Sequence, residues 1–403
     1  MLVGGLRGGG RGLFALDITD PTAFAETSTA AANTVMWEFS SADDADLGYT
    51  FSAPSIVLMP NGEWAVIFGN GYNDTGSGEA QLFILYLEEG LDGTWSSTDY
   101  VKITTGVGDT TTRNGLSTPA VIDTDGDGVA DRAYAGDLLG NMWAFDLSST
   151  NPGNWEVAYR SGTTPEPLFI AGSSKPITAA PVIVRNPDVV TSNQNDPNLL
   201  VMFGSGQYIA TGDNASTATQ SFYGVWDSGN DSLDNSDLVD QTIGTGTTTG
   251  GATGRTVTNN PVDYENGDDG WYMDLPTSGE RVVTDAVVRG DHVFFNTAIP
   301  TTDPCGSGGD GWQMIVKINN GGRPDSVAFD LNGDGLLGTL DEISGEAAAG
   351  AKVRGLPSSP VTLGTKRYTS TTESIDGASI TVDDIEKVSG IDTGRLSWEE
   401  LAR

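Results

Sequence analysis

Cysteine and histidine are almost absent from this chain of 403 residues, which contains one of each, Cys305 and His292. One cysteine cannot form a disulfide within the chain, and one cysteine with one histidine cannot supply the four ligands of a tetrahedral zinc site. A catalytic triad would have to use His292, but this residue precedes an apolar run and is expected at the end of a strand. Cys305 is either a free thiol or half of a bridge to a part of a longer protein. The sequence therefore disfavours histidine and cysteine chemistry, and we expect no enzyme.

Basic residues are also scarce, with 20 lysines and arginines against 55 aspartates and glutamates and a formal charge of −35. Nucleic acids and anionic membranes both attract basic surfaces, so neither is expected as a partner. No run approaches the roughly 18 consecutive apolar residues of a membrane span, which argues against direct membrane insertion. Most of the acidic excess is expected to form a solvated surface that keeps the protein in solution.

The 54 glycines, together with many threonines, asparagines and aspartates, separate short apolar runs rich in β-branched and aromatic residues. This pattern is typical of β-strands joined by tight turns. Helical periodicity is nearly absent, and only residues 383–388 and 397–402 could form a turn or two of helix. The sequence therefore predicts an all-β fold.

The apolar runs follow a loose repeat of three strand types. The first type begins with a small residue and a proline, the second ends near an aromatic residue and a glycine, and the third alternates aromatic and apolar residues. First-type runs lie at residues 53–58, 118–122, 180–184 and 359–363. Second-type runs lie at 66–72, 133–137 and 201–208, and third-type runs at 13–17, 142–146 and 222–227, with degenerate copies at 82–86 and 314–318.

The spacing of this repeat is typical of the blades of a β-propeller. Pro54, Pro119 and Pro181 stand 65 and 62 residues apart, which leaves room for about four short strands and their loops. Stacking such sheets around an axis buries both faces of each sheet and limits exposed edges. Residues 13–17 lack a proline-led partner, whereas residues 359–363 begin a unit near the other end, so the two ends are expected to close the ring. A plain array of β-sandwiches is the alternative.

These patterns predict one propeller domain over residues 1–366. Within it, residues 242–260 are rich in threonine and glycine and are expected to form a low-complexity loop, and residues 367–403 are expected to form a polar tail. Residues 1–6 lack the charged and apolar segments of a secretory signal peptide, which by itself indicates the cytoplasm. Because residue 1 falls inside a repeat, we instead expect a fragment of a longer secreted protein.

Four aspartates crowd into residues 123–131 at alternate positions, with glycines between them. This spacing turns the carboxylates inward, and Gly128 permits the bend that aims the next carbonyl at the same point. Four like charges this close repel one another without a cation. Because strands are expected on both sides, we predict a calcium loop of the propeller type and not a helix-flanked EF-hand. The expected Ca²⁺ ligands are Asp123, Asp125, Asp127, the Val129 carbonyl and Asp131.

A second acidic segment, residues 330–341, has the spacing of a twelve-residue calcium loop and resembles the loops of dockerin domains. Asp341 replaces the usual glutamate at the last position, so the neighbouring Glu342 could reach the ion instead. The expected Ca²⁺ ligands are Asp330, Asn332, Asp334, the Leu336 carbonyl and Asp341.

Motifs along nearly the whole chain resemble the C-terminal propeller domain of the PilY-type proteins of type IV pili. They are glycine-rich, aromatic and acidic motifs in a fixed order, and jointly they are specific. They lie at residues 5–12, 15–17, 68–73, 123–131, 134–138, 140–143, 270–275, 279–282, 303–305 and 330–341. The lone Cys305 departs from the pattern, since members of the family usually have additional cysteines near it.

The resemblance implies a modified seven-bladed propeller that binds Ca²⁺ through residues 123–131. It implies roles in pilus assembly, in opposing pilus retraction, in twitching motility and in surface adhesion. The implied partners are minor pilins or the pilus-tip complex, and a host or abiotic surface. The implied location is extracytoplasmic, at the pilus tip, the cell surface, or the outer membrane or periplasm of a Gram-negative bacterium.

Two other functions remain open. Quinone-dependent dehydrogenases are also propellers with tryptophan-rich blades and calcium, and the 9 tryptophans permit this interpretation. Against it, the acidic loop already supplies enough ligands without a quinone, and there is no vicinal cysteine pair. A carbohydrate-binding surface module is the second alternative.

Overall fold

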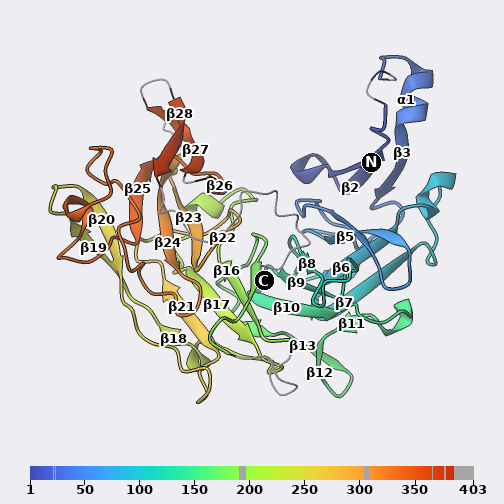
Figure 1. The fold of residues 1–403 in the computed structure, drawn as a ribbon. Coiled ribbons are helices and arrows are strands. Elements are labelled where there is room, and N and C mark those ends of the chain that lie inside the picture. Colours follow the sequence, from blue (N-terminus) through green and yellow to red (C-terminus); the bar gives the residue numbers. More distant parts are fainter. Residues whose placement is uncertain are drawn as a thin grey trace. The chain divides into compact units, whose positions relative to one another are not determined.

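The computed structural model describes residues 1–384 of the chain, except for residues 21, 23, 190–196, 304–307, 365 and 376–377. β-Strands form most of the regular structure (Figure 1), apart from helix α1 (Ser28–Thr34) and single turns of 3₁₀-helix. The chain divides between residues 173 and 174 into two compact units. Cys305 and residues 397–402 lie outside the described residues, whereas Asp383 and Asp384 belong to a strand and not to the helical turn expected there.

The first unit contains three main antiparallel sheets and a separate hairpin. The sheets have the strand orders β1-β2-β3, β4-β5-β6-β7 and β11-β10-β9-β8, with β14 beside β10, and β12 pairs with β13. The strands are β1 (Leu2–Gly5), β2 (Gly12–Leu16), β3 (Val35–Ser40), β4 (Ser55–Leu58), β5 (Trp64–Gly69), β6 (Glu79–Tyr86), β7 (Tyr100–Gly108), β8 (Ala120–Ile122), β9 (Arg132–Gly136), β10 (Asn141–Asp146), β11 (Glu156–Val157), β12 (Tyr159–Ser161), β13 (Thr164–Glu166) and β14 (Phe169–Ile170).

The second unit also contains three sheets, with the orders β15-β16-β17-β21-β18, β19-β20-β25-β24-β23-β22 and β26-β27-β28. Strand β18 runs parallel to β21, and the other strand pairs of the unit are antiparallel. The strands are β15 (Val182–Arg185), β16 (Leu199–Gly204), β17 (Ser221–Asp227), β18 (Val239–Asp240), β19 (Ile243–Thr247), β20 (Thr253–Val257), β21 (Gly270–Asp274), β22 (Val287–Arg289), β23 (His292–Pro300), β24 (Gly309–Lys317), β25 (Gly350–Arg354), β26 (Val361–Leu363), β27 (Lys366–Ile375) and β28 (Ala378–Asp384).

The repeat predicted from the sequence is present in both units. Strands β4, β8, β15 and β26 each directly follow a proline and pair with the next strand along the chain. The third-type strands β6, β10 and β17 pair with the other edge of that second strand. A fourth strand, β7, β11 or β21, completes three of these sheets. The all-β fold is confirmed, while the number of blades and the closing of a ring stay predictions.

The second and third strands of the repeat form the core of each unit. Every residue of β16 and β17 is buried, as expected for strands in the middle of a sheet that are covered on both faces. In the first unit, the rings of Phe68 and Phe83 stack with their centroids 5.5 Å apart. In the second unit, the rings of Phe222 and Phe295 stack at 3.8 Å. Burying each such side chain contributes about 1.5–3 kcal/mol to folding.

The carboxylate of Asp137 lies in the core and accepts hydrogen bonds from the residues around it. It is fully buried after β9 and accepts hydrogen bonds from the N–H groups of Leu139 and Asn141. Its other oxygen accepts hydrogen bonds from the side chains of Asn114 and Trp143, both at 2.9 Å. These contacts compensate for the lost hydration of a buried charge. Asp137 therefore stabilises the tight turn between β9 and β10.

The segment expected to be a low-complexity loop, residues 242–260, is instead largely a hairpin of β19 and β20. Gly246 and Gly254 face each other across this hairpin. A Cβ atom at Gly246 would lie 2.4 Å from the side chain of Ile343, and one at Gly254 would lie 3.1 Å from it. The glycines that gave the segment its low complexity therefore make room for Ile343.

The region expected to be a polar tail begins with two strands, β27 and β28. Arg367 on β27 is fully buried, with its guanidinium 4.7 Å from the ring centroid of Phe329 and donating to Gln313 Oε1 at 2.6 Å. This strand is therefore packed into the second unit. Helix α1 was not predicted either; it begins after Thr27, whose Oγ1 accepts the N–H of Ala30.

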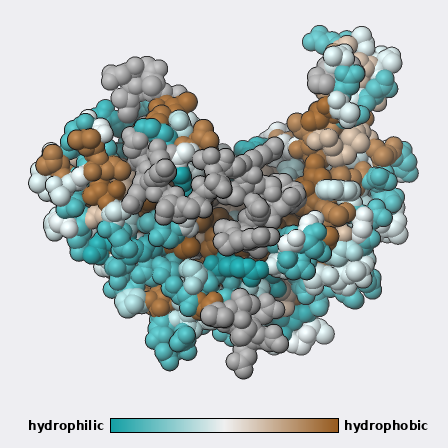
Figure 2. All heavy atoms as spheres, in the orientation of Figure 1, coloured by the Kyte–Doolittle hydropathy of each residue, from teal (hydrophilic) through white to brown (hydrophobic). Residues whose placement is uncertain are grey.

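Hydrophilic and neutral residues dominate the molecular face drawn in Figure 2, with hydrophobic residues in separate patches. This distribution agrees with the acidic composition. None of the helices in the described residues has the length and apolar character needed to span a membrane.

Candidate metal centre

The first acidic loop (residues 123–131) connects β8 to β9 in an antiparallel hairpin. The last pair of this hairpin is Ile122 with Arg132, and Asp131 donates its N–H to the Ile122 carbonyl at 3.0 Å. Ala130 donates its N–H to the carbonyl of Leu58, the last residue of β4, at 2.9 Å. Backbone hydrogen bonds to two sheets therefore fix the base of the loop.

Asp123 and two glycines shape the turn inside this loop. Gly126 and Gly128 have φ angles of +84° and +88°, which glycine adopts without strain. Asp123 Oδ1 accepts the N–H of Gly126 at 2.6 Å, and its Oδ2 accepts the N–H of Gly128 at 2.7 Å. The first carboxylate is therefore held in place by the backbone that follows it.

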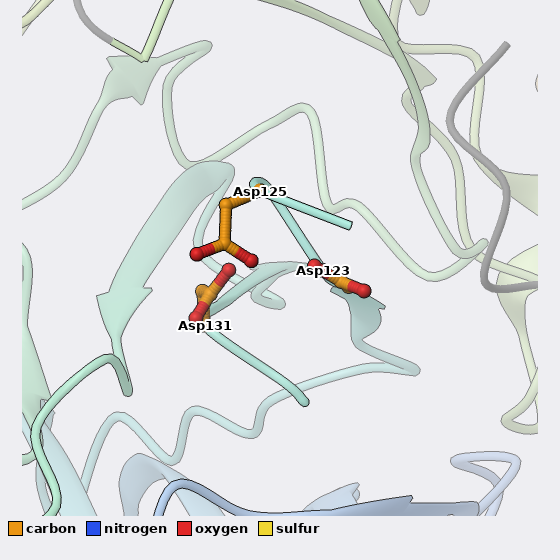
Figure 3. Close-up of side chains that lie close together, drawn as sticks. All are labelled: Asp123, Asp125 and Asp131. Carbon is orange, nitrogen blue, oxygen red and sulfur yellow. The ribbon is translucent and has the colours of Figure 1, made fainter. Parts of the chain in front are cut away.

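The carboxylates of Asp123, Asp125 and Asp131 meet in the loop (Figure 3). Each offers one oxygen, and these oxygens lie within 4.8 Å of one another. The N–H of Asp127 donates to Asp125 and lowers the pKa of this carboxyl group, but burial and the charges of Asp127, Asp131 and Asp123 outweigh that effect and raise the pKa above its ordinary value. The loop therefore concentrates negative charge that its own residues do not neutralise.

This donor set fits a hard divalent cation. All three groups offer carboxylate oxygens, which Ca²⁺ and Mg²⁺ prefer to nitrogen or sulfur. Ca²⁺ takes six to eight oxygens in a flexible arrangement, so three carboxylates leave positions for carbonyl groups and water. Mg²⁺ demands near-ideal octahedral geometry, which suits a nine-residue loop with partly exposed side chains less well.

Asp127 and Val129, which were also predicted as ligands, form a turn of their own. Asp127 Oδ1 accepts the N–H of Val129 at 2.8 Å and does not belong to the group of three carboxylates. Sequence reasoning missed Thr124, whose N–H and Oγ1 both donate to Asp131 Oδ2, at 2.8 and 2.7 Å. Its position directly after Asp123 was the only signal in the sequence.

The second acidic loop (residues 330–341) begins with the same turn. Asp330 Oδ1 accepts the N–H of Gly333 at 2.8 Å, and its Oδ2 accepts the N–H of Gly335 at 2.7 Å. These glycines have φ angles of +76° and +81°. Asn332 Nδ2 donates to Asp334 Oδ2 at 3.0 Å, and Asp334 Oδ1 accepts the N–H of Leu336.

Asp341, at the end of the 3₁₀ turn η7 (Thr339–Asp341), closes the second loop. It is 1% exposed and accepts the N–H groups of Leu331 at 2.8 Å and of Asn332 and Gly338 at 3.1 Å each. Asp341 therefore closes the loop through backbone hydrogen bonds, while the choice between Asp341 and Glu342 as an ion ligand stays a prediction. In the part of the chain that the structure describes, only the first loop brings three acidic side chains within 4.8 Å.

The repeated antiparallel sheets, with an acidic loop between two of their strands, define an all-β protein. The family model of the PilY1 beta-propeller domain matches residues 1–256. The chain therefore belongs to the PilY1 beta-propeller domain family.

Curated relatives and a solved structure agree with this assignment. A type IV pilus biogenesis factor PilY1 homolog of Xylella fastidiosa is 38% identical over 335 residues, which cover 80% of this chain and 22% of the relative. The type IV pilus biogenesis factor PilY1 of Pseudomonas aeruginosa is 33% identical over an alignment that covers 100% of this chain and 36% of the relative. The crystal structure of the Pseudomonas aeruginosa PilY1 C-terminal domain superposes with a TM-score of 0.73 at 29% identity, covering 96% of this chain and 80% of that domain. The chain thus spans well under half the length of these full-length relatives.

Proposed function

We propose that this chain is a calcium-binding domain of a type IV pilus biogenesis protein. The single observation that supports calcium binding is the meeting of Asp123, Asp125 and Asp131 in one loop. Membership of the PilY1 family supports the link to pili. Asp127 and the Val129 carbonyl are proposed as further ligands, and the second acidic loop as a weaker site.

A bound Ca²⁺ supplies positive charge and no reaction chemistry. It removes the repulsion among carboxylates that come from the beginning, middle and end of the loop. Because Asp123 already bonds to Gly126 and Gly128, and Asp131 to Thr124, the ion connects groups that are fixed to the backbone. Calcium binding therefore rigidifies the connection between β8 and β9.

Isothermal titration calorimetry of the 403-residue chain with CaCl₂ tests this proposal. We expect a saturable heat from the first loop, and Asp131→Ala should weaken the affinity of this loop for Ca²⁺ by about a hundredfold, since one ligand and the partner of Thr124 are removed together. Heat that remains in Asp131→Ala at higher CaCl₂ concentration is assigned to the second loop. Asp146→Ala is the matched control, because Asp146 is an exposed aspartate of the same sheet and lies outside the loop. Equal heats for Asp131→Ala and the wild type would refute the assignment of the site.

We further propose that the domain acts outside the cytoplasm, at the pilus tip or the cell surface. There it would engage minor pilins and take part in pilus assembly, in opposing retraction, in twitching motility and in adhesion to host or abiotic surfaces. The names of the curated relatives, type IV pilus biogenesis factors, support this proposal.

Co-purification with minor pilins tests the proposed partner. The wild-type chain and the Asp131→Ala variant are each mixed with minor pilins of the same organism, with CaCl₂ or with a chelator. Retention by the wild type in CaCl₂ alone supports a calcium-dependent contact, and retention in every condition supports a contact that calcium does not control. No retention in any condition contradicts the proposed partner.

A further inference from the structure

Three aromatic side chains of the first unit, those of Tyr49, Phe51 and Tyr72, form a partly exposed cluster, the aromatic surface. The ring centroid of Tyr72 lies 5.4 Å from that of Tyr49 and 5.3 Å from that of Phe51. Tyr49 and Phe51 belong to the connection between β3 and β4, and Tyr72 belongs to the connection between β5 and β6. Neither the family assignment nor the calcium proposal gives the aromatic surface a role.

The two connections approach each other closely at glycines. Tyr49 donates its N–H to the carbonyl of Tyr72 at 2.7 Å. A Cβ atom at Gly48 would lie 2.4 Å from the carbonyl oxygen of Tyr72, and one at Gly71 would lie 2.0 Å from the carbonyl oxygen of Tyr49. Any larger residue at these two positions would push the connections apart. The backbone under the rings is therefore fixed before a partner arrives, which lowers the entropic cost of binding.

A glycine-rich loop, residues 6–12, is anchored beside the rings. Thr50 is 1% exposed, and its Oγ1 accepts the N–H of Leu6 at 2.9 Å. A Cβ atom at Gly8 would lie 3.5 Å from the Phe51 ring, so the loop runs past this ring at van der Waals distance. The exposed side chains of the loop therefore extend the aromatic surface.

Two of these side chains are the arginines Arg7 and Arg11. The Arg11 guanidinium lies over the Tyr49 ring, with Cζ 5.0 Å from the ring centroid. The Nε of Arg11 is buried without a hydrogen-bond partner, but the side chain is partly exposed, so a ligand can reach its Nη groups. Among the described residues, neither arginine forms an ion pair. A guanidinium stacked on a ring keeps the N–H groups at its edge available for a carboxylate.

The aspartates that flank the aromatic residues in the sequence are already paired with other cations. Lys102 lies 3.0 Å from Asp44 and 2.6 Å from Asp46, and Arg113 lies 3.3 Å from Asp74. These carboxylates therefore do not neutralise the arginines of the loop. In a chain with a formal charge of −35, this exposed positive charge favours a partner that brings its own carboxylate.

From these contacts we propose that the aromatic surface and the arginines of the loop bind an acidic segment of a protein partner, in which a carboxylate stands next to an apolar side chain. The carboxylate pairs with the Nη groups of Arg11, Arg7 adds a second positive charge, and the apolar side chain packs on the rings. Exposed clusters of tyrosine and arginine are typical of the centres of protein interfaces.

Two observations favour a peptide over an acidic polysaccharide, which also carries carboxylates. The Tyr72 ring is tilted by 32° relative to that of Tyr49 and by 44° relative to that of Phe51, so the three rings share no flat face on which sugars could stack. Leu6, 49% exposed on the same loop, adds an aliphatic group that matches an apolar side chain. The partner is therefore expected to be a protein.

Selection of a phage-displayed library of random dodecapeptides on the immobilised 403-residue chain tests this proposal. We expect the selected peptides to carry Asp or Glu next to an apolar residue. Affinity for a fluorescent copy of the most enriched peptide, measured by polarisation, should fall by about tenfold for Arg11→Gln, because a charge-assisted hydrogen bond is lost. Arg160→Gln is the matched control, since Arg160 lies in the same unit and already pairs with Glu156; it should bind as the wild type does.

A double-mutant cycle shows whether the peptide carboxylate contacts Arg11. Replacing the acidic residue of the peptide by its amide should cost about tenfold with the wild type and much less with Arg11→Gln. If Arg11→Gln does not fold, Arg7→Gln should still weaken binding by about threefold. Asp131→Ala should bind the peptide as the wild type does, so failure of the calcium proposal leaves this proposal intact.

The proposal is overturned if no selected peptide carries a carboxylate whose contribution to binding depends on Arg11 or Arg7. Polygalacturonate, a polymer of acidic sugars, distinguishes the other source of carboxylates. If it binds the wild type and loses affinity in Arg11→Gln while no peptide is selected, the surface binds an acidic polysaccharide, and the protein partner is ruled out.

Discussion

The first acidic loop (residues 123–131) and the second (residues 330–341) begin with the same turn. In each, the first aspartate accepts the N–H groups three and five residues later, and glycines with positive φ stand at the fourth and sixth positions. In each, the closing aspartate also accepts the N–H of the second residue, Thr124 or Leu331. The same local hydrogen bonds therefore shape the backbone of both turns.

The two loops differ in how many charges converge. The first has Asp125 at its third position, and this carboxylate joins those of Asp123 and Asp131. The second has the neutral Asn332 there, which donates to Asp334. Charge count and rigidity set the affinity of calcium loops over several orders of magnitude. The comparison therefore predicts that the first loop is the tighter of the two proposed calcium sites, although the second has the more familiar twelve-residue spacing.

The effect of calcium on amide hydrogen exchange should differ most between the two loops. Exchange of the Gly126 and Gly128 N–H groups should be about a hundredfold slower with calcium at a hundred times its Kd than in chelator, because opening requires release of the ion. At the same concentration, Gly333 and Gly335 should change much less. Exchange measured by mass spectrometry in both buffers checks this, and equal protection of the two loops would contradict the ranking.

Replacing Asp125 by asparagine makes the first loop resemble the second. Asp125→Asn keeps an oxygen at the third position but removes one of three converging charges. Calcium affinity measured by calorimetry should fall by about thirtyfold. Asp146→Asn, on the same sheet and outside the loop, should leave it unchanged. An affinity for Asp125→Asn within a factor of two of the wild type would show that charge convergence is not what binds the ion.

Much of the fold could be predicted because its signals are local. A proline directly precedes each of the first strands β4, β8, β15 and β26. An aromatic residue and a glycine mark the end of each second strand, so each signal lies within a few residues of the strand that it predicts. The hairpin of β19 and β20 could not be predicted, because the glycines that weaken its strand signal are there to accommodate Ile343, about a hundred residues later. Arg367 likewise looked polar and exposed, but its guanidinium lies over the rings of Phe294 on β23 and of Phe329, which are distant in the sequence.

The candidate sites likewise have features that could be predicted from the sequence and features that could not. The spacing of Asp123, Asp125 and Asp131 was visible in the sequence, because a short loop with two glycines has few ways to fold. The hydrogen bonds of Asp341 could not be predicted, since they depend on which side chain reaches the N–H groups of a turn ten residues earlier.

The reverse substitution, Asn332→Asp, should strengthen the second loop. It adds a third acidic side chain beside Asp330 and Asp334 and removes the hydrogen bond from Asn332 Nδ2 to Asp334. Calcium affinity at this site should rise by about tenfold, and the calcium-free loop should become less ordered. Calorimetry in the Asp131→Ala background isolates the second site. No gain in affinity would mean that hydrogen bonds from backbone N–H groups hold the Asp341 carboxylate away from an ion.

A third acidic cluster shows how the chain neutralises carboxylates without a metal. Lys102 Nζ lies 3.0 Å from Asp44 Oδ2 and 2.6 Å from Asp46 Oδ2. Burial raises the pKa of Asp46, but the hydrogen bonds from Lys102 and from Ser77, together with the Lys102 charge, outweigh it and bring the pKa down to about 2. In this cluster, unlike in the first acidic loop, the side chain of Lys102 supplies the positive charge.

Lys102→Met should therefore destabilise the fold in a way that calcium does not repair. The loss should be only about 1 kcal/mol at pH 7, because Lys102 is partly exposed and solvent screens the pair. The pKa of Asp46 is lower in the folded chain than its unfolded value of about 3.9, so its contribution is present above about pH 4 and is lost as the pH falls through about 2. Urea unfolding is measured in the presence of a chelator between pH 2 and 7. As the pH falls, the free energy of unfolding should decrease less steeply for Lys102→Met than for the wild type. Lys102→Arg is the control. An unchanged pH dependence would mean that Ser77, and not Lys102, holds the Asp46 charge, and this cluster would then resemble the backbone-held carboxylates of the acidic loops.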